Sequence, residues 1–281
     1  MSRVNLVHCT PEAEKLIVRM ARVSNPANQE NDETAPRLLR YLIKHSHWSP
    51  FQMATMCVQI ETERDIAAQI LRHSSFAFQE FSTRYAKTDV ADAPHQRLQD
   101  HKNRQNSIDE LDPYMQSYWA ERISDSIALS FSLYEQMLNE GIAKETARRI
   151  LPLCTPTTLY MCGSLRSWIH YIQLRSANGT QAEHQEIAIA CRNIFAEQFP
   201  VLSRQLEYCI NYIEHHCHKI YYPELLEELK RYRHDNRTKF DTVVSFMIML
   251  LTMTGQTKAQ AVAKKKAPLV EAYTVDLFKY I

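Results

Sequence analysis

The stretch Arg72–Tyr85, with the sequence RHSSFAFQEFSTRY, is the most informative part of this chain. It opens with Arg72-His73-Ser74 and continues, after seven residues, with Ser82-Thr83-Arg84-Tyr85. Arginine forks match phosphate oxygens in pairs, and hydroxyl or backbone N–H groups satisfy further acceptors. The phenylalanines between them offer flat apolar surfaces for stacking on a ring: Phe76, Phe78 and Phe81. The pattern indicates a site for an anionic, ring-bearing ligand such as a nucleotide. In an arbitrary sequence, a solvated loop with chance arginines would be the commoner outcome.

The spacing of this stretch resembles the signature of the flavin-dependent thymidylate synthases. In that family Arg-His-Arg is followed by seven residues, a serine, one further residue and an arginine. The chain matches every fixed position except the third, where Ser74 stands in place of arginine, and it is identified as a member of the family. The replacement removes one cation from the expected flavin site. We therefore predict weaker flavin binding than in a form with arginine at position 74.

Composition limits the classes of protein that fit. The chain has 281 residues, of which 45% are apolar and 23% charged, as in ordinary soluble globular proteins. With a formal net charge of +1, the protein as a whole has no electrostatic attraction for nucleic acid or an anionic membrane. The amino terminus lacks the apolar core of a signal peptide, and the most apolar run, 243–253, is about half the roughly 20 residues of a spanning helix. These features predict a cytoplasmic protein that binds neither membrane nor nucleic acid.

Cysteine and histidine patterns give no metal site. The seven cysteines are scattered and form no C-x-x-C pair, so neither a disulfide framework nor a zinc ribbon is indicated. The run His215-His216-Cys217-His218 contains good zinc ligands. Adjacent helical positions diverge by about 100°, however, so these side chains cannot all face one ion. We expect no metal.

Hydrophobic spacing predicts an α+β fold of mixed helices around a central sheet. With only four glycines there is no phosphate-binding glycine loop, which argues against a Rossmann fold. A polar loop is expected over 89–106, and a turn at Asn178-Gly179, where many relatives of the family have a histidine that contacts the cofactor. The expected strands are 56–61 and 157–162. The expected helices are 11–23, 35–45, 64–71, 114–140, 144–151, 165–174 and one opened by a capping box at 180–183. Residues 1–221 are predicted to form the catalytic domain and residues 222–281 a helical C-terminal extension.

The resemblance implies a set of flavin-binding residues. The segment His45–Phe51 resembles the amino-terminal flavin segment of the family, with His47 and Ser49 near the cofactor, and a weaker match places Ser24 there. Without the resemblance, His47 would more often be an ordinary surface or core histidine. The full set of expected flavin contacts is Ser24, His47, Ser49, Arg72, His73, Ser74, Glu80, Ser164, Arg166 and His170.

The resemblance also implies the residues that bind the nucleotide. Arg175 corresponds to an arginine that binds the pyrimidine carbonyl edge, where a guanidinium would stabilise negative charge developing on the ring. Ser82 would lie near the reacting base carbon as a donor and positioner; it is not expected to be a nucleophile, because no base is placed to activate it. Arg148 would be an ordinary surface arginine without the other motifs. The substrate-binding set is Gln69, Arg72, Glu80, Phe81, Ser82, Thr83, Arg84, Arg148 and Arg175, with Arg175 and Ser82 as the catalytic pair.

The activity implied by the resemblance is reductive methylation of dUMP to dTMP. 5,10-Methylenetetrahydrofolate would supply the carbon, and FAD reduced by NADPH would supply hydride, in a homotetramer with shared active sites. Two alternatives remain open: a catalytically impaired member of the family, and a non-catalytic nucleotide- or RNA-binding protein. Near-zero net charge and the lack of a basic stripe speak against RNA.

Overall fold

The computed structural model describes residues 2–177 and 179–206. Residues Met1–Gln205 form one compact unit. The predicted extension 222–281, its boundary at residue 221 and the His215–His218 run all lie outside the described residues, so those predictions stay predictions.

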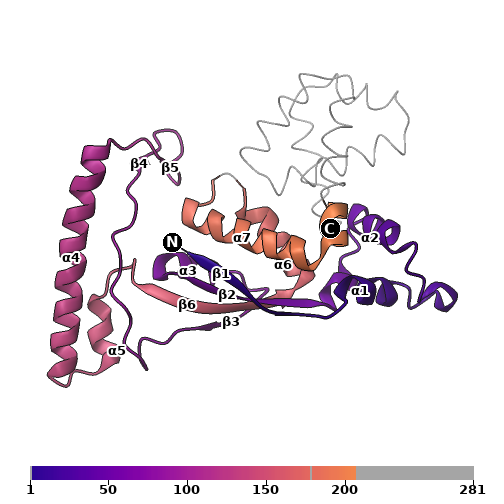
Figure 1. Cartoon of the computed structure of the whole chain (residues 1–281), viewed down its shortest axis with the longest axis horizontal. Helices are drawn as coiled ribbons and strands as arrows, with labels where there is room; N and C mark the ends of the chain where they lie inside the picture. The colour runs from indigo at the N-terminus through magenta and orange to yellow at the C-terminus, as the bar shows by residue number, and fades with distance from the viewer. Residues whose placement is uncertain (1, 178, 207–281) are drawn as a thin grey trace, which may run out of the picture. The chain divides into compact units, whose positions relative to one another are not determined.

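A central antiparallel sheet organises this unit. Its strands are β1 (Arg3–Cys9), β2 (Thr55–Glu63), β6 (Pro156–Ser164) and β3 (Ala77–Glu80), in the order β1-β2-β6-β3 (Figure 1). Every neighbouring pair is antiparallel, whereas a Rossmann sheet is mostly parallel. The predicted α+β class with a central, non-Rossmann sheet is confirmed.

The central strand β2 forms because its apolar side chains alternate along the chain. Met56, Val58 and Ile60 are fully buried, whereas Gln59 and Glu61, between and after them, are half-buried. The predicted strand 56–61 is therefore confirmed, and β2 extends it to Thr55–Glu63. Its whole length pairs with β6, the other predicted strand.

Helices α6 (Leu165–Arg175) and α7 (Ala182–Gln198) lie over one face of the sheet (Figure 1). Trp168 of α6 is fully buried, and its indole N–H donates to the Met56 carbonyl at 2.8 Å. Burial of such a ring contributes on the order of 2–3 kcal/mol, and the hydrogen bond removes the cost of burying its polar atom. α6 also follows β6 directly, so this contact holds the end of α6 at a defined place above the sheet.

The remaining helices also follow the predicted pattern. Their ends differ from the predicted ends by a few residues, and the predicted helix 144–151 divides into α5 and a 3₁₀ turn. The longest, α4, begins at Asp112, whose carboxylate accepts from the backbone N–H groups of Tyr114 and Met115. The bounds are α1 Ala13–Ala21, α2 Ala35–Lys44, α3 Arg64–Ile70, α4 Pro113–Asn139 and α5 Lys144–Ala147, with 3₁₀ turns η1 Pro26–Asn28, η2 Ser49–Gln52 and η3 Arg148–Ile150.

Two strands of the sheet were not predicted. Ala77–Glu80 pairs with β6 as edge strand β3, and β1 pairs with β2 at the other edge. Edge strands depend on the partner strand more than on their own pattern. The predicted loop over 89–106 is mostly irregular, with a short ladder between β4 (Leu98–Gln99) and β5 (Ser107–Ile108).

The capping box predicted at 180–183 is wrong. Helix α7 begins one residue later, with Gln181 as its N-terminal cap and no side-chain hydrogen bond at that position. Glu183, which would have closed the box, pairs instead with Arg97, and the cap residue Gln181 pairs with Gln69. Long-range contacts therefore override the local motif.

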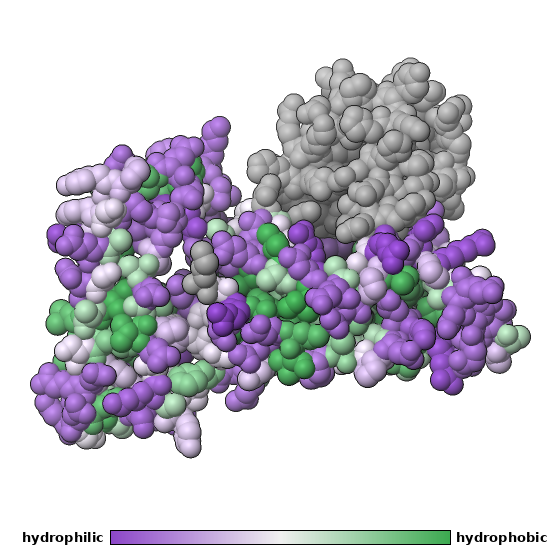
Figure 2. Space-filling view, viewed as in Figure 1, coloured by the Kyte–Doolittle hydropathy of each residue, from purple (hydrophilic) through white to green (hydrophobic). Residues whose placement is uncertain are grey.

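Apolar residues also reach the surface away from the sheet. Figure 2 shows them over α4 as well as over the middle of the unit, with polar residues around both. On α4, Leu129 is 72% exposed and Leu133, one turn later, is 46% exposed. No helix within the described residues is both long and apolar enough to cross a lipid bilayer.

Candidate active site

The signature stretch begins at the carboxyl end of α3. Gln69 lies in the last turn of this helix, Arg72 and His73 follow it, and the His73 N–H donates to the Ile70 carbonyl at 3.1 Å. The helix predicted over 64–71 is confirmed, and it places Arg72 and His73 directly after its carboxyl end. Arg72 is exposed and His73 is half-buried.

His73 meets Arg175, the residue predicted to bind the pyrimidine ring. Arg175 closes α6, and its Nε donates to Nε2 of His73 at 2.9 Å. The rings of His73 and Tyr171 pack edge to face, with centroids 5.0 Å apart. Two motifs separated by about a hundred residues in sequence are thus joined by one hydrogen bond.

His184 of α7 belongs to the same group, although sequence analysis did not single it out. It is fully buried; its Nε2 lies 3.2 Å from the Tyr171 hydroxyl and its Nδ1 lies 3.4 Å from Oε1 of Gln69. The only local signal was a histidine just inside a helix start, which is too common to indicate a site. The Gln69 amide is held from both sides, because its Nε2 donates to Gln181 Oε1 at 2.7 Å.

Burial keeps both histidines of this group neutral. The pKa of His73 falls to about 4, first because of burial and then because of Arg175 and His170. The pKa of His184 falls to about 3, again first through burial and then through Arg175 and His73. A neutral His73 can accept the Arg175 N–H, as the 2.9 Å contact requires. Arg175 therefore keeps its orientation, and its charge is not repelled by a neighbouring imidazolium.

A second group surrounds the end of the signature. Nη1 of Arg148 donates to the Thr83 hydroxyl at 3.1 Å. Both line a cavity of about 170 Å³ whose walls are Arg64, Thr83, Arg148, Arg149, Leu151, Pro152 and Leu153. Three arginines on one small cavity suit an anion such as a phosphate.

Two signature residues are held by partners within the chain. Glu80 accepts from the Thr157 hydroxyl at 3.0 Å and lies 3.7 Å from Arg64. Arg84 forms an exposed ion pair with Glu145 at 3.1 Å, an interaction worth about 0–1 kcal/mol. A ligand anion can therefore displace Glu145 from Arg84 at little cost.

Ser82 and Phe81 are both exposed. Among the residues that the structure describes, no side chain hydrogen-bonds the Ser82 hydroxyl. This agrees with the prediction that Ser82 is a hydrogen-bond donor rather than an activated nucleophile.

Phe76 was predicted as a possible stacking surface, but it packs inside the protein. Its ring lies 4.9 Å from that of Trp168. It also covers Gly163, where a Cβ atom would come within 2.4 Å of the Phe76 ring. The ring is therefore used for packing.

The predicted flavin contacts fall in three places. Ser24, His47 and Ser49 lie around α1, α2 and η2; Ser74 follows α3; Arg166 and His170 lie on α6. All of these side chains are exposed. Ser164 caps α6, and its hydroxyl accepts from the Ser167 N–H at 3.2 Å. The turn η2, which contains Ser49, contacts α6, and just after it the Leu165 N–H at the start of α6 donates to the Ala54 carbonyl at 2.9 Å.

Comparison with known proteins assigns the chain to one enzyme family. The family model described as thymidylate synthase complementing protein, Thy1, matches residues 5–201. The chain therefore belongs to the flavin-dependent thymidylate synthase family, whose members are methyltransferases.

Two curated relatives carry the family name. The chain is 54% identical over 197 residues to a probable flavin-dependent thymidylate synthase of Paramecium bursaria Chlorella virus 1, covering 70% of this chain and 91% of the relative. It is 49% identical over 195 residues to the flavin-dependent thymidylate synthase of Synechocystis, covering 69% and 90%. Among solved structures, the UMP/dUMP methylase PolB from Streptomyces cacaoi bound with 5-Br dUMP matches with a TM-score of 0.66 at 24% identity, over 74% of this chain and 95% of that one. This likeness supports the fold.

Proposed function

We propose that this chain catalyses the reductive methylation of dUMP to dTMP, with 5,10-methylenetetrahydrofolate as carbon donor and NADPH-reduced FAD as hydride donor. The observation that carries the proposal is the Arg175–His73 hydrogen bond, which joins the signature to the arginine expected at the pyrimidine. The names of the two relatives and of the structural neighbour point to the same substrate class.

In this proposal Arg175 is the catalytic residue at the base. Its Nε is committed to His73, so the terminal guanidinium nitrogens remain to donate to a ring carbonyl. Charge developing on that oxygen would be stabilised by a donor already held in place, an effect worth about 10²–10³ in rate for one donor. Gln69, His184 and Tyr171 act as positioning residues, because their hydrogen bonds and ring contacts support His73 and the end of α6.

The nucleotide phosphate would bind at the second group. Arg148 is already oriented by Thr83, and Arg84 and Arg149 supply further donors nearby. Ser82 and Phe81, at the end of β3, would then lie between phosphate and base as a hydroxyl donor and an apolar contact. Glu80 belongs to both predicted sets, and its contacts with Thr157 and Arg64 also hold this strand end.

The donor set fits a flavin dinucleotide. Guanidinium, imidazole and hydroxyl groups are the donors that a diphosphate and a flavin ring need, and those of Arg72, Ser74, Arg166 and His170 are exposed. When bound, FAD would supply the hydride-transfer chemistry. The chain's part is to bind it and orient it, with Ser24, His47, Ser49, His73, Glu80 and Ser164 completing the set.

We further propose that the enzyme is a cytoplasmic homotetramer with shared active sites. The resemblance to the family implies this assembly, with active sites built from residues of several subunits. The exposed apolar pair Leu129 and Leu133 on α4 offers a surface for such an interface.

The experiment is an anaerobic assay for dTMP with dUMP, 5,10-methylenetetrahydrofolate, NADPH and added FAD, preceded by an absorbance spectrum for bound flavin. We expect product from the parent chain and a loss of about 10²-fold or more in kcat for Arg175→Lys. Arg192→Lys is the matched control, because Arg192 is an exposed residue of α7, and it should keep parental activity. Flavin binding without dTMP would favour a catalytically impaired member of the family. Absence of both would overturn the proposal.

A further inference from the structure

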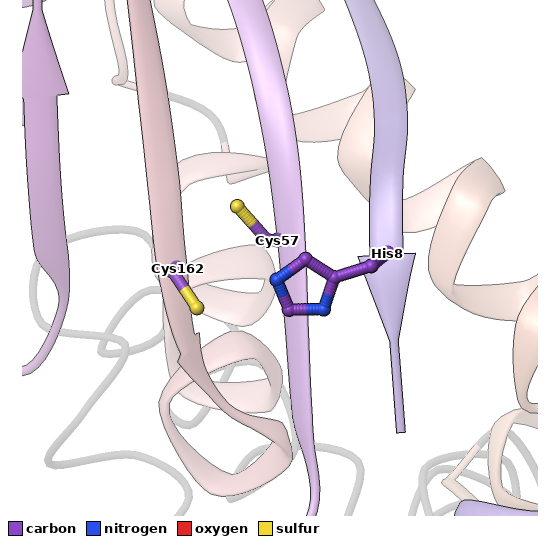
Figure 3. Close-up of side chains that lie close together, drawn as sticks. All are labelled: His8, Cys57 and Cys162. Carbon is purple, nitrogen blue, oxygen red and sulfur yellow. The ribbon is translucent and has the colours of Figure 1, made fainter. Parts of the chain in front are cut away.

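Three metal-ligating side chains meet on the sheet face opposite α6 and α7. His8 of β1, Cys57 of β2 and Cys162 of β6 come from three neighbouring strands (Figure 3). One ring nitrogen and the two sulfurs all lie within 4.8 Å of one another. None of these residues belongs to the candidate active site.

The sheet register places them in one row. Cys57 is the direct partner of Cys162 in the β2–β6 ladder and of His8 in the β1–β2 ladder. Direct cross-strand partners have Cβ atoms about 4.5–5.5 Å apart and point to the same face. The row is therefore a consequence of strand pairing, which the spacing of the cysteines along the chain does not reveal.

A bulge in β1 brings His8 to this face. The register shifts between Leu6, which pairs with Val58, and His8, which pairs with Cys57. With regular alternation His8 would share the inner face with Leu6, two residues earlier. Bulges commonly re-aim a side chain in this way. Within the described part of the chain, neither ring nitrogen of His8 has a hydrogen-bond partner.

The chemistry of the set selects a class of ion. Two thiolates and one imidazole are ligands of zinc and of related soft divalent ions. In a tetrahedral zinc site the ligand atoms lie about 3.5–3.8 Å apart, so small side-chain rotations would bring these three to bonding distance. Cys57 is nearly buried, Cys162 is half-buried and His8 is exposed. The fourth position would therefore open toward the solvent side.

We propose that His8, Cys57 and Cys162 form a three-ligand site for a zinc-class divalent ion, with water at the fourth position. The ion would tie the edge strand β1 to the two central strands. A disulfide between Cys57 and Cys162 is the competing use of the pair; both are free thiols in the structure. The bulge favours the metal, because a disulfide would have no need of His8 on this face.

The test is a Co²⁺ titration of the reduced, metal-free full-length chain, followed by competition with Zn²⁺. The background carries Cys209→Ser and Cys217→Ser, so that thiols beside the His215–His218 run do not contribute. We expect one Co²⁺ per chain with a thiolate charge-transfer band, and at least tenfold weaker binding for His8→Ala. His8 is exposed, so this variant should fold. Cys162→Ser should lose about half of the band.

Cys9→Ser is the matched control. Cys9 follows His8 directly, but its thiol contacts Oε1 of Gln198 at 3.6 Å, so Co²⁺ binding should be unchanged. Co²⁺ affinity that is unchanged in His8→Ala, together with a band of parental intensity in Cys162→Ser, would overturn the proposal. A reduced chain that takes up no Co²⁺ would also overturn it. If that chain in addition loses two mass units in air at Cys57 and Cys162, the pair is assigned to a disulfide.

Discussion

Ser74 is the residue at which this chain departs from the family signature. Its side chain is exposed beside Arg72, so an arginine can be introduced without disturbing the core. One additional charge-assisted hydrogen bond to a bound diphosphate contributes about 1–2 kcal/mol when it is partly exposed.

We expect Ser74→Arg to bind FAD about 5- to 30-fold more tightly than the parent, measured by equilibrium titration of flavin fluorescence. Ser75→Arg is the control, because position 75 is also exposed but is not the signature position. No gain in Ser74→Arg, or an equal gain in the control, would show that position 74 does not limit flavin affinity.

Gly163 is required by the approach of the Phe76 ring. A Cβ atom there would lie 2.4 Å from Cδ1 of Phe76, so the ring would have to leave its contact with Trp168. We expect Gly163→Ala to lower the free energy of unfolding by about 1–3 kcal/mol, measured by urea denaturation. In a Phe76→Ala background, Gly163→Ala should lower the free energy of unfolding by much less. An equal cost in both backgrounds would assign the loss to the strand backbone.

At the scale of elements, the end of α2 carries a strained residue. Ser46 has φ 56° and sits where helix ends usually have glycine. The N–H of His47 donates to the Leu42 carbonyl at 2.8 Å and the N–H of Ser46 to Ile43 at 3.1 Å, which together make a Schellman motif. The left-handed conformation costs a serine about 1–2 kcal/mol, and it directs the chain into the predicted flavin segment.

We expect Ser46→Gly to raise the free energy of unfolding by up to about 1 kcal/mol, since the larger entropy of the unfolded glycine offsets part of the relief. Thermal denaturation measures this. Ser46→Ala keeps a Cβ atom and should give no gain. A gain in the alanine variant would mean that the serine hydroxyl, rather than the backbone angle, limits stability.

At the scale of the whole molecule, the buried histidines make stability depend on pH. The pKa of His184 is about 3 in the folded chain, against an ordinary value of 6.5. Between these values the unfolded chain takes up a proton that the folded chain does not. The free energy of unfolding therefore falls as pH falls from 6.5 toward 3, by at most about 1.4 kcal/mol per pH unit for each such histidine.

Replacement of His184 by glutamine removes this titration. We expect the pH dependence of the free energy of unfolding to be shallower between pH 6.5 and 4 in His184→Gln than in the parent, even if the variant is less stable throughout. Urea denaturation across this range measures it. Parallel curves for the two proteins would contradict a neutral, buried His184.

Assembly is the second property of the whole molecule. If α4 contributes to a tetramer interface, a charge at Leu129 should weaken it, because a buried unpaired carboxylate is strongly disfavoured. We expect Leu129→Glu to shift the mass measured by light scattering from tetramer toward smaller species. Ser124→Glu, at an exposed position on the same helix, should not shift it. A monomeric parent chain would contradict the tetramer itself.

Much of the fold was accessible from local pattern. The alternation in β2 and the helical spacing in α2, α4 and α6 come from burial of one side of each element, which a sequence records directly. The edge strands β1 and β3 and the start of α7 were missed because partners far along the chain decide them: β6 for β3, and Gln69 and Arg97 for the first turn of α7. The candidate site shows the same division. Arg72, His73 and Arg175 were identified by motif spacing, whereas His184 was missed because only helix packing brings it to the site.

The sequence by itself determined the family, the class of fold and the arginines that can meet an anionic nucleotide. Their residue types and gapped spacing are local and chemical, so they can be recognised without coordinates. Only the tertiary structure decided that His73 accepts from Arg175, that His184 is buried beside them, and that His8, Cys57 and Cys162 share a face. These depend on strand register, a bulge and helix packing. Such features arise from contacts between distant segments, and no local pattern encodes them.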